Sequence, residues 1–217
     1  MIPLRALLYR RNAAVITMFL IGINILCFLY EMTLPIYFRD RLIEHYGLVP
    51  DRLAPVTFIS SMFLHGGWLH LIGNMWFLWV FGSHIEDAMG PAKFLIFYLL
   101  SGIASAAVQF AILFGSPVPT IGASGAIAGV MGAFLILYPR VRVVTLVFIV
   151  IFITTVEIPA AFMLLYWFFL QIVSGVGYLS SVSNGQGIAW FAHVGGFLAG
   201  IVLVRVFRHD RSRMSYR

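Results

Sequence analysis

Charged residues are scarce in this sequence. They make up 10% of the 217 residues, whereas hydrophobic residues make up 61%, and the mean hydropathy is +0.98. A soluble domain normally carries about a quarter of its residues as charged side chains. This composition therefore excludes a soluble globular fold, and we expect one compact membrane domain that crosses the bilayer several times.

Cysteine and acidic residues are also rare. The single cysteine, Cys27, excludes an internal disulfide and a cysteine-based metal site, and we expect it to pack inside the first apolar run. The chain has 14 basic and 8 acidic residues, but the basic residues flank apolar runs and form no patch with interleaved aromatic residues. We therefore predict no nucleic-acid partner, and membrane orientation explains the basic residues.

The apolar residues fall into seven runs, some long enough for a transmembrane helix of about 20 residues. The runs are 13–30, 56–81, 94–114, 121–138, 141–156, 158–179 and 188–207. The first run follows three arginines, as the apolar part of a signal peptide does. No small-residue cleavage site follows it, so we expect it to be a retained span.

The placement of basic residues predicts how the chain is oriented in the membrane. Residues 1–12 carry three arginines, 139–142 carry two, and 205–217 carry five, whereas 31–55 holds three arginines against four acidic residues. Because arginine and lysine favour the cytoplasmic side, we expect both termini to be cytoplasmic and the long first loop to be external.

This orientation requires an even number of crossings, so one of the seven runs must not cross. Run 141–156 is short, rich in β-branched residues, and followed by Glu157 and Pro159, so we expect an apolar loop in or on the membrane. The sequence thus predicts an all-α, polytopic membrane protein with a large external first loop. Its membrane domain, 13–207, lies between basic cytoplasmic tails at 1–12 and 208–217, with six transmembrane helices at 13–30, 56–81, 94–114, 121–138, 158–179 and 188–207.

Ser124 and His193 are the two residues that most directly indicate chemistry. The orientation places both near the external ends of their spans, within GASG at 122–125 and AHVGG at 192–196. A hydroxyl is a poor nucleophile until a base removes its proton, and imidazole is the base suited to neutral pH. The small residues explain both motifs as helix packing alone, but close packing is also what a Ser–His contact of about 3 Å requires.

We expect a dyad without an orienting carboxylate, because the acidic residues between the spans lie away from the level of Ser124. His70 and Asn74 are four residues apart on one face of the expected second span, and His65 lies a turn and a half earlier. Their side chains offer hydrogen bonds to an oxyanion, together with the Ser124 backbone N–H. Interhelical hydrogen bonding is the alternative role for these residues.

Four motifs together resemble the rhomboid family of intramembrane serine proteases, in its bacterial form. They are HGGWLHxxxN at 65–74, GxxxExxxG at 82–90, GASG and AHVGG. The resemblance implies a six-helix endopeptidase that cleaves membrane-protein substrates in or near their transmembrane segments. We expect no cofactor and no metal, because the sequence has no ligand cluster with metal spacing. We also expect the protein to lie in the lipid bilayer of a bacterial cytoplasmic membrane, with an active site that opens to the external side, as the charge placement indicates.

The resemblance also implies a role for each matching residue. Ser124 would be the nucleophile and His193 the general base, and Asn74, His70 and the Ser124 backbone N–H would bind the oxyanion. Supporting positions would be Gly122, Gly125 and His65. Segment 179–187 would correspond to the family's cap over the active site, and 158–179 to the helix past which a substrate enters.

Two positions depart from the family pattern. Many members have a Trp–Arg pair in the first loop, where this chain has Val56 and Thr57. Some have an aromatic residue one turn after the serine, where this chain has Ala128. An inert relative that binds membrane clients is therefore the alternative function, although such relatives typically lose the serine or the histidine. A small transporter or channel is a third hypothesis, but the sequence has no internal repeat, and its intramembrane polar residues cluster near one face of the membrane.

Overall fold

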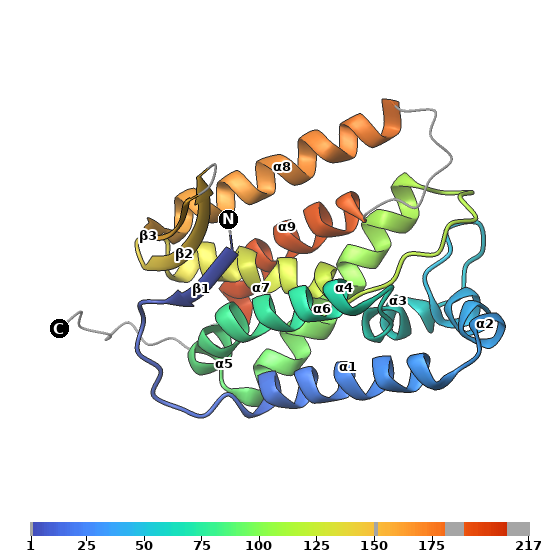
Figure 1. Cartoon of the computed structure of the whole chain (residues 1–217), viewed down its shortest axis with the longest axis horizontal. Coiled ribbons are helices and arrows are strands. Elements are labelled where there is room, and N and C mark those ends of the chain that lie inside the picture. The colour runs from blue at the N-terminus through green and yellow to red at the C-terminus, as the bar shows by residue number, and fades with distance from the viewer. Residues whose placement is uncertain (1, 150–151, 181–188, 208–217) are drawn as a thin grey trace.

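The structure is a computed structural model that describes residues 2–149, 152–180 and 189–207. It is mainly helical, with one small sheet (Figure 1). In chain order the elements are β1 (Ile2–Ala6), α1 (Val15–Thr33), α2 (Ile36–Tyr46), α3 (Thr57–Ser60), the 3-10 turn η1 (Ser61–Phe63), α4 (Trp68–Phe77), the π-helical turn η2 (Leu78–Gly82), α5 (Ser83–Met89), α6 (Pro91–Ile112), α7 (Ser124–Leu137), β2 (Arg142–Ile149), β3 (Phe152–Pro159), α8 (Ala160–Ser180) and α9 (Trp190–Phe207).

Four helices within the described ranges are long and apolar enough to cross a membrane: α1, α6, α8 and α9. Helix α7 is apolar but has only 14 residues. The bundle also exposes many large apolar side chains, among them Phe19 on α1, Phe169 on α8 and Val202 on α9. Soluble monomers rarely expose so much apolar surface. The chain is therefore a multi-pass membrane protein.

Helix α7 lies at the centre of the packing, where its most extensive contact is with α9, and α6 packs against both. Figure 1 shows α1 and α8 along opposite sides of the bundle. The sheet lies at one end and α2 at the other. This arrangement brings the starts of α7 and α9, separated by more than 60 residues in sequence, to one place in the core.

The expected second span, 56–81, is wrong as a single helix. Residues 57–63 form two short turns, Leu64 has an extended backbone, and the helix begins only at Trp68. It then continues through η2 and α5 to Met89. The break falls at Gly66 and Gly67, because glycine weakens a helix by about 1 kcal/mol relative to alanine. His65 therefore precedes the helix that carries His70, whereas the predicted span placed both residues on one helix.

The expected apolar loop at 141–156 is also wrong, since β2 and β3 form an antiparallel hairpin there. Val143 pairs with Ile158 and Thr145 with Val156. Strand β1 adds to the free side of β2, so residues 2–6 belong to the folded unit and not to a tail. The all-α description therefore fails at this sheet, which the β-branched residues favour. The run forms no membrane-crossing helix, as predicted. The predicted tail 208–217 and most of the predicted cap lie outside the described residues.

Glu86 joins the start of α1 to α5. Its carboxylate accepts hydrogen bonds from the backbone N–H groups of Ile16 and Thr17, both at 2.8 Å, and from the Thr17 hydroxyl at 2.7 Å. These N–H groups are in the first turn of α1, where they have no intrahelical acceptor and where the helix dipole favours an anion. The GxxxExxxG motif thus caps a distant helix.

Candidate active site

Ser124 and His193 are in contact. Ser124 is the first residue of α7, and His193 lies in the first turn of α9. The Ser124 Oγ is 2.7 Å from the His193 Nε2, and the imidazole is buried. This is the distance expected between a nucleophile and its general base. The structure thus brings together the two residues that the sequence had placed at equal depth.

Glycines permit this contact by letting α7 and α9 approach each other closely. A Cβ atom added to Gly196 would overlap the carbonyl oxygen of Gly125, and one added to Gly200 would overlap that of Gly129. Because backbone atoms cannot rotate out of the way, only glycine fits at Gly196 and Gly200. Small residues of this kind allow membrane helices to pack at short range. The packing and catalytic interpretations of the two motifs are therefore compatible.

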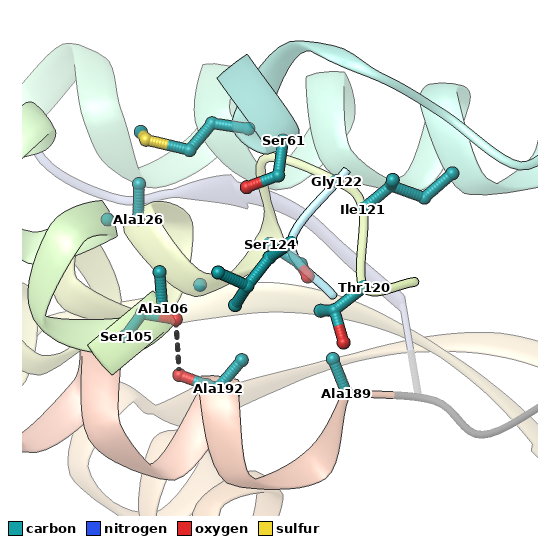
Figure 2. A pocket seen from close by; sticks show the side chains of 14 residues that line it. Ser61, Ser105, Ala106, Thr120, Ile121, Gly122, Ser124, Ala126, Ala189 and Ala192 are labelled. Atoms are coloured by element: carbon teal, nitrogen blue, oxygen red, sulfur yellow. Dashed lines mark hydrogen bonds between the residues drawn. The ribbon is translucent and has the colours of Figure 1, made fainter. Parts of the chain in front are cut away.

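Helix α6 fixes the start of α9 through polar contacts to Ala192. The Ser105 hydroxyl donates to the Ala192 carbonyl oxygen at 2.7 Å, and the Ala192 N–H donates to the Gln109 Oε1 at 3.0 Å. Figure 2 shows the first of these bonds beside Ser124. The pocket at this position has a volume of about 20 Å³, which is room for about one water molecule. The backbone immediately before His193 is thus held in place.

His70 and Asn74 approach the same region from α4, across the loop that precedes Ser124. Gly122 has φ of 119°, a left-handed conformation that favours glycine, and a Cβ there would lie 2.7 Å from the His70 Nε2 and 3.5 Å from the Asn74 Nδ2. The Asn74 Nδ2 is also 3.0 Å from the His65 Nε2. His65 therefore reaches Asn74 although it is not on the helix.

Glu31 is a residue of this region that sequence reasoning left in the external loop. It lies in the last turn of α1, is buried, and accepts a hydrogen bond from the His65 N–H at 3.2 Å. A signal was present, because Thr17, Asn24 and Glu31 recur every seven residues and all face the core. The polar side of α1 thus extends to the loop that carries His65.

Helix α8 contributes two further residues to the site: Gln171, which the sequence did not indicate, and Trp167, one of four aromatic residues (Phe162, Trp167, Phe168 and Phe169) that the sequence indicates only as possible control of substrate entry. The Gln171 Oε1 is 2.7 Å from the His193 Nδ1, and the Trp167 ring centroid is 5.7 Å from that of the imidazole. His193 is therefore not held by packing alone. Of the aromatic residues on α8, Trp167 and Phe168 face α9, whereas Phe162 and Phe169 are exposed.

A cavity of about 870 Å³ reaches this group of residues. Its lining runs from Arg39 and Asp40 on α2 to Ser124 and His193. It also includes His65, His70, Asn74 and Trp167. Because this lining combines charged, polar and apolar side chains, polar and apolar groups can both enter the cavity. The Ser124 hydroxyl is therefore accessible although it lies within the helical bundle.

Comparison with known proteins identifies the family. The family model described as Rhomboid domain matches residues 53–210, which is more than half of the chain. The chain therefore belongs to the rhomboid family.

Individual relatives agree with this assignment. The chain is 32% identical over 145 residues to RHOMBOID-like protein 6, mitochondrial, of Arabidopsis thaliana, and the match covers 67% of this chain and 41% of that protein. It is 28% identical over 163 residues to Rhomboid protein 1, mitochondrial, of Saccharomyces cerevisiae, covering 69% of this chain and 41% of the relative. It is 40% identical over 77 residues to Rhomboid protease GluP of Bacillus subtilis, covering 36% of this chain and 15% of the relative. The chain thus spans less than half the length of each of these relatives.

Proposed function

We propose that this protein is an intramembrane serine endopeptidase that uses Ser124 and His193 as a dyad. The observation that carries the proposal is the 2.7 Å contact between the Ser124 Oγ and the His193 Nε2. Membership of a family that includes a protein named a rhomboid protease supports it. The substrates would be membrane proteins, cleaved in or near a transmembrane segment.

In the proposed reaction His193 takes the proton of the Ser124 hydroxyl as the oxygen attacks the scissile carbonyl carbon. The Nε2–H of the resulting imidazolium then donates its proton to the leaving amine as the C–N bond breaks. Water hydrolyses the acyl-enzyme in a second, equivalent step, which regenerates Ser124 and releases a carboxylate.

The tetrahedral intermediates need hydrogen-bond donors directed at their oxyanion, each worth about 3–4 kcal/mol when well placed. Ser124 is the first residue of α7, so its backbone N–H has no acceptor within the helix. The Asn74 amide and the His70 ring lie beside Gly122, two residues before Ser124. We assign the oxyanion site to these three groups.

The proposal includes a topology of six crossings: α1, the helical segment from α4 to α5, then α6, α7, α8 and α9. Both termini would be cytoplasmic, so the starts of α7 and α9, and with them the cavity, would face the external side. The protease domain would then extend over residues 13–207. The proposed location is a bacterial cytoplasmic membrane. This location rests on the sequence alone, and two of the relatives above are instead mitochondrial by name.

The decisive test is activity of the purified protein in detergent against a model substrate with one transmembrane segment. Wild type should cleave it and should be labelled covalently by a fluorophosphonate, whereas Ser124→Ala and His193→Ala should do neither and should still fold. Cleavage or labelling that persists in Ser124→Ala would refute the assigned nucleophile. Substrate binding without cleavage or labelling by wild type would instead favour the inert, client-binding alternative.

A further inference from the structure

Gln171 makes two hydrogen bonds that together fix the orientation of its side-chain amide. Its Nε2 donates to the Trp167 backbone carbonyl, one turn earlier on α8, at 3.2 Å. Its Oε1 is 2.7 Å from the His193 Nδ1, and the side chain is only 6% exposed. A carbonyl oxygen can only accept a hydrogen bond, so the amide nitrogen must face Trp167 and the amide oxygen must face His193.

This orientation determines which nitrogen of the neutral imidazole carries the proton. Because the Gln171 Oε1 can only accept, the His193 Nδ1 must be protonated to complete the hydrogen bond. A neutral imidazole has one N–H, so the Nε2 then has a free lone pair, and it is this lone pair that faces the Ser124 hydroxyl. The opposite tautomer would direct an N–H at Ser124 and could not accept its proton.

We propose that Gln171 is the positioning residue that selects the reactive tautomer of His193. The proposal rests on the proposed protease function and adds a third member to the dyad. A carboxylate in this position would place a charge in a buried, apolar environment, which is costly. The neutral amide accepts the same hydrogen bond without that cost. Gln171 remains bonded to the Nδ1–H when His193 becomes protonated, so it is compatible with both states of the base.

The same helix also fixes the plane of the imidazole. The Trp167 ring contacts the imidazole in a tilted arrangement, with ring centroids 5.7 Å apart and an interplanar angle of 38°, whereas Ala128, one turn after Ser124, has no ring. Trp167 and Gln171 are four residues apart, so they project from one face of α8. The Phe168 ring stacks on Phe197 of α9 at 4.5 Å and keeps this face against α9. His193 is thus oriented from α8.

The test compares Gln171→Leu, Gln171→Glu and wild type in detergent, with Val173→Leu as a matched control. Val173 is half exposed on the same helix and outside the site, so the control should retain wild-type kinetics. Gln171→Leu keeps a similar volume but loses the acceptor. We expect its kcat to fall about 10- to 100-fold, which is a partial loss of the roughly 10²–10⁴-fold that proton transfer contributes, with KM within about twofold of wild type.

Gln171→Glu tests the role through the pH dependence of kcat/KM, which would not change if Gln171 had only a structural role. A carboxylate next to the Nδ1 favours the protonated imidazole, so the acidic limb of the kcat/KM profile should move to higher pH by about one unit. Among the described residues, the titratable group that acts electrostatically on His193 is His70 of α4, which is the same in every variant. An unchanged pH profile in Gln171→Glu, with wild-type kcat in Gln171→Leu, would refute the positioning role.

A measurement on the unmodified chain keeps the proposal testable if a variant does not fold. Nitrogen NMR of histidine-labelled wild type should show the His193 Nδ1 protonated and the Nε2 bare at neutral pH, and the opposite tautomer would overturn the proposal. The result is also separable from the proposed function. If Ser124→Ala abolishes cleavage while Gln171→Leu has wild-type kinetics, the dyad stands and the role of Gln171 fails. If wild type neither cleaves nor reacts with the phosphonate, the protease function itself fails.

Discussion

Adding one methyl group at the α7–α9 contact should displace His193 from Ser124. Gly196 lies one turn after His193, and its Cα faces the carbonyl of Gly125, the residue that follows Ser124. In Gly196→Ala the new Cβ would overlap that carbonyl oxygen. Both helices are held by other contacts, so α9 can relieve the overlap only by moving away from α7 at the level of the active site.

The expected magnitude follows from the geometry. A shift of roughly 1.5 Å is needed to restore an ordinary van der Waals contact, and a misplacement of about 1 Å already reduces turnover by roughly 100-fold. Overpacking a well-packed core also costs about 1–3 kcal/mol of folding free energy. We therefore expect kcat to fall by about two orders of magnitude, with a measurable decrease in thermal stability.

The assay combines cleavage of a single-span substrate, the rate of phosphonate labelling and thermal unfolding in detergent. Gly22→Ala on α1 is the control, because a Cβ atom there meets no heavy atom within 4 Å. It should match wild type in cleavage and labelling, and its melting temperature should be equal to or slightly above that of wild type, because alanine favours a helix over glycine. A Gly196→Ala protein with wild-type labelling rate and melting temperature would show that helix contact at Gly196 does not position His193.

Three further outcomes are expected. Asn74→Ala should lower kcat by about 10²–10³-fold with little change in KM, since the oxyanion exists only after attack. Steady-state kinetics measure both constants, and a loss of substrate affinity as large as the loss of kcat would indicate a structural role. Glu86→Gln should lower the free energy of unfolding by about 2–3 kcal/mol, because the side chain that accepts three hydrogen bonds loses its negative charge. Denaturation curves in detergent measure this free energy, and an unchanged midpoint of the curve would contradict the capping role. EDTA should leave the cleavage rate unchanged, because no cluster of three candidate metal ligands occurs among the described residues; inhibition that added metal reverses would contradict a metal-free dyad.

The amino-acid sequence by itself determined the class of protein and the positions of most long helices. The apolar runs at 94–114, 158–179 and 188–207 correspond to α6, α8 and α9, and each helix boundary lies within three residues of the predicted one. Such runs form helices because a backbone in lipid must satisfy its hydrogen bonds within the segment. Ser124 and His193 were recognisable because a hydroxyl and an imidazole stand out among small apolar residues at equal depth.

The local pattern was ambiguous where two structures had similar preferences. Run 141–156 is apolar enough for a loop on the membrane, but its β-branched residues pair as a hairpin once β1 supplies a neighbouring strand. Run 56–81 is apolar throughout, yet Gly66 and Gly67 interrupt it and place His65 outside α4. In both cases a contact with a distant segment, or a small backbone preference, outweighed hydrophobicity.

Only the tertiary structure decided how His193 and the oxyanion site are held. Gln171 is the single glutamine of run 158–179, but no spacing rule connects it to a histidine 22 residues later on another helix. Glu31 meets His65 only because the end of α1 packs beside the start of α4. The packing of separate helices decides which side chains reach the site. That packing depends on the close approach of α9 to α7 at Gly196 and Gly200, and a contact between two helices cannot be read from the sequence of either one alone.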